Sequence, residues 1–183
     1  MLLEIARWGA SDCSQLPMIE MPDSKREQLA WQELIELDLL TKQKQLTLDG
    51  KKAAAFPCHP RFAKMLLSAQ HLAQQQEILH LLSLACLLVA LLEERDIFNP
   101  QQRTDDCDIA HRVMLLCQQP KKAHHQRIIV QAQRFFRLAN NQVITRIAEQ
   151  TLQQAKLSSS LCITVNELPI QHCGLILLHA YPE

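Results

Sequence analysis

The chain has 183 residues, of which 48% are hydrophobic and only three are glycine, so it can bury a core as one domain or two small ones. Scarce glycine and aromatic residues favour helices over sheets and predict a mainly α protein. The seven cysteines form no Cys-x-x-Cys pair and no signal-peptide pattern opens the sequence. This argues against a disulfide-bonded secreted protein and predicts reduced thiols and a cytoplasmic location.

The first 58 residues read as a linker followed by a winged helix. Pro17 and Pro22 bracket an extended stretch, and Asp23 is placed to cap a helix from Ser24 to about Leu37. Leucines on both sides of the polar segment 41–45 indicate a small β-hairpin, and another short helix follows it. Helix, hairpin and helix in this order are the outline of a winged helix, so we expect a linker at 1–22 and a winged-helix domain at 23–58.

Residues 59–183 read as a helical bundle. Pro60 suits the first position of a helix that runs to about Ala73. The next helix, over 78–94, is apolar on nearly every side but spans only about 22 Å up to Leu92, short of the ~30 Å bilayer core. We therefore expect it to be buried at the centre, with no membrane partner. Further helices are expected at 108–118 after a cap at Asp105 or Asp106, from Pro120 to a bend at Asn140-Asn141, at 143–157, and from Pro169 to Pro182.

Charge is unevenly distributed along the chain. Residues 1–110 carry eleven Lys and Arg against sixteen Asp and Glu, residues 111–156 carry eight against one, and the remainder carries two acids and no base. A basic helical block in an otherwise acidic chain is typical of a nucleic-acid contact. The alternative is an ordinary solvated helix face. The candidate nucleic-acid-binding residues are Lys121, Lys122, His124, Arg127, Arg134, Arg137 and, at the end of the central helix, Arg95.

Three stretches resemble, in the same order, a segment of the HrpB-type branch of bacterial DEAH helicases. The opening stretch is Leu3-Glu4-Ile5-Ala6-Arg7-Trp8-Gly9, with Asp12 and Leu16-Pro17 after it. The second is the run from Leu46 to Phe98, and the third is Gly174-Leu175-Ile176-Leu177-Leu178-His179-Ala180-Tyr181-Pro182. The chain departs from the family pattern at Asp38, where a glycine is usual, and at Met18 and Met21-Pro22.

The resemblance implies the accessory part of an ATP-dependent RNA helicase, in which a winged helix braces the motor and a ratchet-like helical bundle closes a channel over the strand. On this reading residues 1–22 lead from a motor domain absent from this chain. The partners implied are single-stranded RNA, or alternatively DNA, and the motor domains of the same helicase. ATP and Mg²⁺ would belong to the parent helicase. This chain has no Gly-x-x-x-x-Gly-Lys-Ser/Thr loop and no Asp-Glu-x-His, so we expect no cofactor and no activity from it alone.

Two other function classes fit the same sequence. One is a helical protein-interaction module whose basic face is incidental. The other is a winged-helix DNA-binding regulator, although the helix before the hairpin lacks an obvious base-reading set of Arg, Asn and Gln. Cys107 with His111, and the adjacent His172-Cys173, do not supply four zinc ligands at characteristic spacing, so neither a metal site nor a catalytic residue is expected.

Overall fold

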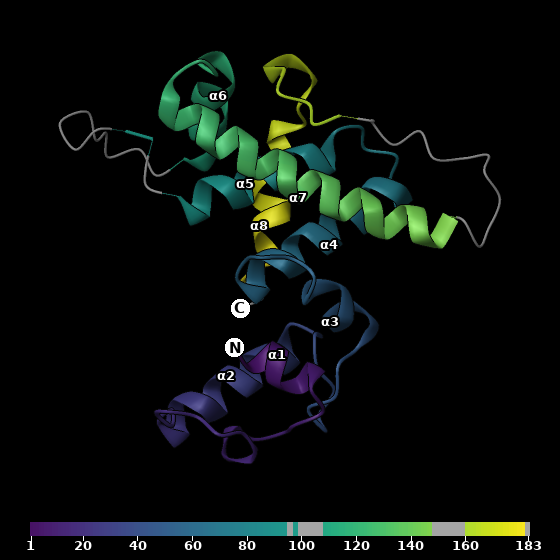
Figure 1. Cartoon of the computed structure of the whole chain (residues 1–183). Coiled ribbons are helices and arrows are strands. Elements are labelled where there is room, and N and C mark those ends of the chain that lie inside the picture. The colour runs from purple at the N-terminus through teal and green to yellow at the C-terminus, as the bar shows by residue number, and fades with distance from the viewer. Residues whose placement is uncertain (95–96, 99–107, 148–159, 182–183) are drawn as a thin grey trace. The chain divides into compact units, whose positions relative to one another are not determined.

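The computed structural model describes residues 1–94, 97–98, 108–147 and 160–181 (Figure 1). The described chain is mainly helical, as predicted. It forms two compact units, one made of Met1–Leu67 with the C-terminal residues from His179, the other of Ser68–Leu178. The linker and domain boundaries expected at 22 and 58 stay predictions.

The first unit begins with α1 (Leu2–Arg7), the 3₁₀ turn η1 (Cys13–Gln15) and α2 (Ser24–Glu36), and α1 packs against α2. Asp23 caps α2 as predicted, because its side chain accepts a hydrogen bond from the Arg26 backbone N–H. Glu27 joins α2 to the preceding loop. Its Oε1 accepts from Trp31 Nε1 at 2.9 Å and from the Cys13 backbone N–H at 3.0 Å.

The predicted β-hairpin does not form strands. In the part of the chain that the structure describes, pairing is confined to one antiparallel bridge between Leu40 and Leu46. The reason is length: α2 ends at Glu36, and Thr47 already caps the next helix, α3 (Leu48–Ala53), by accepting from the Gly50 N–H at 2.9 Å. Residues 37–40 alone lie between α2 and the turn at 41–45, and Leu46 alone lies between that turn and the Thr47 cap. A winged helix with a regular hairpin is therefore not observed.

The same turn depends on a close approach at Gly50. A Cβ at this position would overlap the backbone oxygen of Leu39. That oxygen also accepts hydrogen bonds from the Thr47 backbone N–H and from Thr47 Oγ1, each at 3.1 Å. Asp38, just before it, has a φ of 55°, a left-handed conformation that glycine adopts most readily.

In the second unit, α5 (Leu81–Glu93) is the central helix, as predicted. Every residue from Leu81 to Leu91 is buried. It packs against α6 (Ile109–Gln118), α7 (Ala123–Ile147) and α8 (Cys173–Leu178), and Figure 1 shows α7 running along it. The end of α4 (Pro60–Gln75) also belongs to this unit.

Three details differ from the sequence-based expectation. The bend at Asn140-Asn141 is wrong, because α7 continues through both residues to Ile147. Asp108 caps α6 by accepting from the Ala110 N–H at 2.9 Å, while Asp105 and Asp106 lie outside the described residues. The last helix is only α8, preceded by the 3₁₀ turns η3 (Val165–Glu167) and η4 (Ile170–His172). Among the described helices, none has both the length and the apolarity to cross a bilayer.

Candidate functional site

The predicted basic residues lie together at the start of α7 and along its outer side. Lys121 and Lys122 are exposed in the turn before the helix, and His124 is half-buried in its first turn. Arg127, Arg134 and Arg137 are all exposed. We call these six residues the α7 basic face. Arg95, the seventh candidate, lies outside the described residues.

The orientation of α7 follows from its apolar stripe. The six residues of this stripe follow the spacing of a core-facing helix side and are all buried: Ile128, Ile129, Ala132, Phe135, Phe136 and Ala139. At about 100° per residue, Arg127 and Arg134 fall on nearly the same line of the helix and away from this stripe. They are two turns apart, a rise of about 10 Å. Phe135 and Phe136 are core residues and cannot stack on bases.

The five Lys and Arg residues of this face have no acidic ion-pair partner among the described residues. They are Lys121, Lys122, Arg127, Arg134 and Arg137. The sequence of α7 contains no acidic residue. At the edge of the helix, Gln131 Nε2 donates a hydrogen bond to Glu93 Oε2 of α5 at 2.9 Å. The cations therefore present their charge to solvent.

His125 holds the turn that carries the two lysines. Its Nδ1 lies 2.9 Å from the Gln119 backbone oxygen, which can only accept, so Nδ1 donates. The ring is buried, and this burial lowers its pKa below the ordinary value, with the nearby Lys122 acting in the same direction. Sequence reasoning missed this residue because a histidine on the apolar stripe gives no signal of the loop carbonyl that it will meet.

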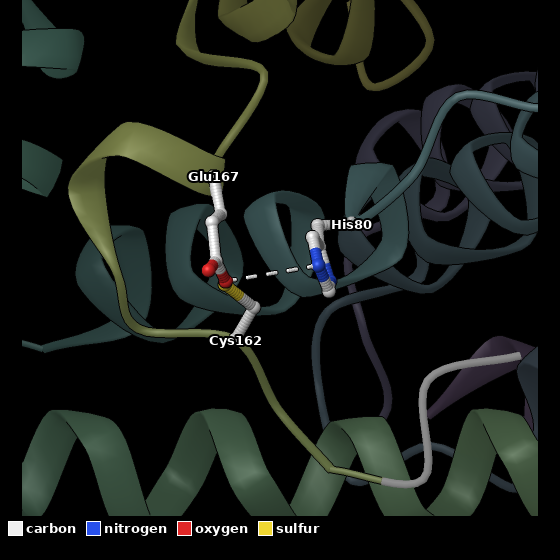
Figure 2. Close-up of side chains that lie close together, drawn as sticks. All are labelled: His80, Cys162 and Glu167. Atoms are coloured by element: carbon white, nitrogen blue, oxygen red, sulfur yellow. Dashed lines mark hydrogen bonds and ion pairs between the residues drawn. The ribbon is translucent and has the colours of Figure 1, made fainter.

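A second polar cluster joins His80, Cys162 and Glu167 (Figure 2). His80 immediately precedes α5. Cys162 lies in the C-terminal segment that the structure describes from Ser160 onward, and Glu167 ends η3. Glu167 Oε2 lies 3.9 Å from His80 Nε2 and 3.4 Å from Cys162 Sγ. Their potential ligand atoms all lie within 4.8 Å of one another. Burial raises the pKa of the Cys162 thiol, so it is protonated at neutral pH and donates to the carboxylate.

Sequence reasoning did not anticipate this cluster. Its members come from two segments separated by 82 positions between His80 and Cys162, and no local spacing links them. Of the pairs considered from sequence, Cys107 lies outside the described residues. His172 and Cys173 do not belong to a group of three potential ligands in the part of the chain that is described.

Comparison with known proteins adds no family assignment. The sequence matches no protein-family model, and a search of curated proteins also finds no match. The likeness to DEAH helicases therefore rests on the three sequence stretches alone.

Proposed function

We propose that this chain is a nucleic-acid-guiding accessory region of an HrpB-type ATP-dependent RNA helicase, and that the α7 basic face contacts the phosphate backbone of single-stranded RNA. The observation that carries the proposal is the group of five exposed cations that form no ion pair within the described residues: Lys121, Lys122, Arg127, Arg134 and Arg137. The order of the three helicase-like stretches supports the choice of parent protein. The motor domains of that helicase would be its protein partners, and they would bind ATP and Mg²⁺.

The chemistry of the α7 basic face suits backbone contact more than base reading. Lysine and arginine neutralise phosphates and release counterions, which gives affinity without sequence preference. The lysines also stand at the N-terminal end of a long helix, where the macrodipole favours anions. The aromatic residues of α7 are buried, so bases have no stacking platform on this helix. We therefore expect weak, sequence-tolerant binding.

In this proposal the first unit takes the place of the winged helix, with the turn at 41–45 as a shortened wing. Lys44 in that turn is already engaged, since its Nζ donates to the Ser11 backbone oxygen at 2.8 Å and lies 4.7 Å from the Trp31 ring centroid. Because Lys44 is engaged within the first unit, this turn suits a structural bracing role better than contact with RNA. The α7 basic face is accordingly the part assigned to RNA.

The proposal is tested by titrating a fluorescently labelled single-stranded RNA with the full chain at low and at moderate salt. Arg127→Glu with Arg134→Glu reverses two charges of the α7 basic face and should abolish binding. Lys25→Glu with Arg26→Glu makes the same change of charge at two exposed positions of α2 and should leave most of the affinity. Circular dichroism checks that both double variants fold.

The outcomes separate the rival function classes. An equal loss of RNA affinity in both double variants would show that binding depends on the net charge of the chain and not on the α7 basic face. No binding by the unmodified chain at low salt would remove the proposal and favour the protein-interaction module. Tight binding to duplex DNA with a marked sequence preference would favour the winged-helix regulator.

A further inference from the structure

The cluster of His80, Cys162 and Glu167 combines the three ligand types that zinc uses in proteins. Imidazole nitrogen, cysteine sulfur and carboxylate oxygen converge on one point from the start of α5 and from the C-terminal segment (Figure 2). This cluster belongs to the second unit and is separate from the α7 basic face.

Two of the three distances between the potential ligand atoms are close to those of a tetrahedral site. Zinc bonds of about 2.0–2.3 Å to nitrogen, oxygen and sulfur place neighbouring ligand atoms roughly 3.3–3.7 Å apart. The observed distance from Cys162 Sγ to Glu167 Oε2 is 3.4 Å, and that from His80 Nε2 to the same oxygen is 3.9 Å. The third separation, between His80 Nε2 and Cys162 Sγ, lies within 4.8 Å, so binding one ion also requires these two atoms to come closer together. The Glu167 side chain is 59% exposed and is free to rotate toward the same ion.

The other two ligands are held in place before any ion binds. The Cys162 backbone N–H donates to Ser83 Oγ at 3.1 Å, and Ser83 is fully buried in α5. His80 is the N-cap residue of the same helix and has a φ of 63°, a conformation that costs energy for a non-glycine residue. Its ring is mostly buried. Strained residues of this kind persist where the surrounding structure fixes them, and they are frequent at functional sites.

The His80 ring is also incompletely satisfied. Within the described residues its Nδ1 is buried and accepts or donates no hydrogen bond. No local hydrogen bond to Nδ1 therefore fixes the tautomer, and the Nε2 lone pair can be directed at a cation beside Glu167 and Cys162.

We propose that His80 Nε2, Cys162 Sγ and a Glu167 carboxylate oxygen bind one Zn²⁺, with water in the fourth position. The mixture of nitrogen, sulfur and oxygen suits zinc, whereas Ca²⁺ and Mg²⁺ prefer sites made of oxygen alone. As the Zn–S bond forms, the Cys162 S–H bond breaks and its proton leaves to solvent, so no electron transfer is involved. The ion would tie the C-terminal segment to the start of α5.

The test uses the metal-free full chain and Co²⁺ as a spectroscopic substitute for Zn²⁺. Binding should give a thiolate-to-cobalt charge-transfer band in the near ultraviolet and the visible bands of tetrahedral cobalt, at one ion per chain, and Zn²⁺ should displace both. Cys162→Ser should remove the charge-transfer band. Glu167→Gln changes an exposed side chain and should keep the fold. It should weaken Co²⁺ and Zn²⁺ binding at least about tenfold, because even the loss of a residue that only supports a metal ligand costs about that much.

Cys173→Ser is the matched control, since Cys173 is a buried free cysteine of the same unit outside the cluster. Its spectrum and affinity should equal those of the unmodified chain. The proposal is overturned if no charge-transfer band forms, if the band survives Cys162→Ser, if Cys173→Ser removes it, or if Glu167→Gln binds as tightly as the unmodified chain. Should Cys162→Ser fail to fold, Glu167→Gln and the stoichiometry decide the outcome without it.

Discussion

Ser83 and Cys162 are joined by a buried hydrogen bond across 79 residues, in which the Cys162 backbone N–H donates to Ser83 Oγ at 3.1 Å. Ser83 is a polar residue in a helix that is otherwise almost entirely apolar, and this contact gives it a partner. It fastens the C-terminal segment to α5. The position of Glu167 beside His80 depends on the same attachment.

Ser83→Ala should lower the free energy of unfolding by about 1–3 kcal/mol, because it leaves a buried backbone N–H without an acceptor. Chemical denaturation followed by circular dichroism measures the change. Ser68→Ala in α4, which exchanges a half-buried serine for a better helix former, should be nearly neutral. Equal stability of the two variants would show that the bond contributes little.

Leu84→Asp or Leu88→Asp should prevent folding. Both side chains are fully buried, and an unpaired carboxylate there costs a large part of a total stability of about 5–15 kcal/mol. Leu79→Asp, at an exposed position just before α5, should retain a cooperative thermal transition. A native-like melt of either core variant would contradict the central position of this helix.

Gly50→Ala should destabilise the first unit by about 1–3 kcal/mol or more, because the added methyl group overlaps the Leu39 backbone oxygen and the backbone must shift. Gly174→Ala is the matched control. A Cβ at Gly174, within α8, meets no atom within 4 Å, and alanine should raise stability by about 0.5–1 kcal/mol. Urea denaturation of the two variants should therefore show changes of opposite sign.

Stability should fall as the pH drops below neutrality. Burial lowers the pKa of His125 from the ordinary 6.5, so the folded state binds this proton less readily than the unfolded state does. The contribution is fully present above about pH 6.5 and is lost as the pH falls through the lowered value. His179 in the first unit has a pKa shifted in the same direction, also chiefly by burial.

Thermal melting between pH 5 and pH 8 measures this dependence. His125→Gln keeps a donor for the Gln119 carbonyl but cannot titrate, so its melting temperature should vary less with pH than that of the unmodified chain. An identical pH dependence in the variant would show that His125 is not responsible.

Helices and their exposed faces could be predicted from the sequence because the signals are local. The apolar run 81–91 can only be a buried helix, and the spacing of Ile128, Ala132 and Phe135 fixes which side of α7 faces the core. The exposure of Arg127 and Arg134 follows from that stripe. The cap at Asp23 could also be predicted, because an Asp directly before a helix is a local signal.

Features that depend on distant segments could not be predicted in this way. The hairpin was wrong because its length is set by where α2 ends and by the cap at Thr47, not by the leucine pattern. The cluster of His80, Cys162 and Glu167 needs the bond between Ser83 and Cys162, which no sequence period encodes. Eight histidines and seven cysteines offered too many pairings to choose among.

The salt dependence of RNA binding tests the central claim most directly. If phosphate contacts by the α7 basic face supply the affinity, the logarithm of the binding constant should fall linearly with the logarithm of salt concentration. Replacing Arg127 and Arg134 by alanine should then reduce the slope by about 1.4, or about 0.7 for each lost contact with a single strand. A slope unchanged by this double substitution, or affinity that does not respond to salt, would contradict the assignment of RNA to this face.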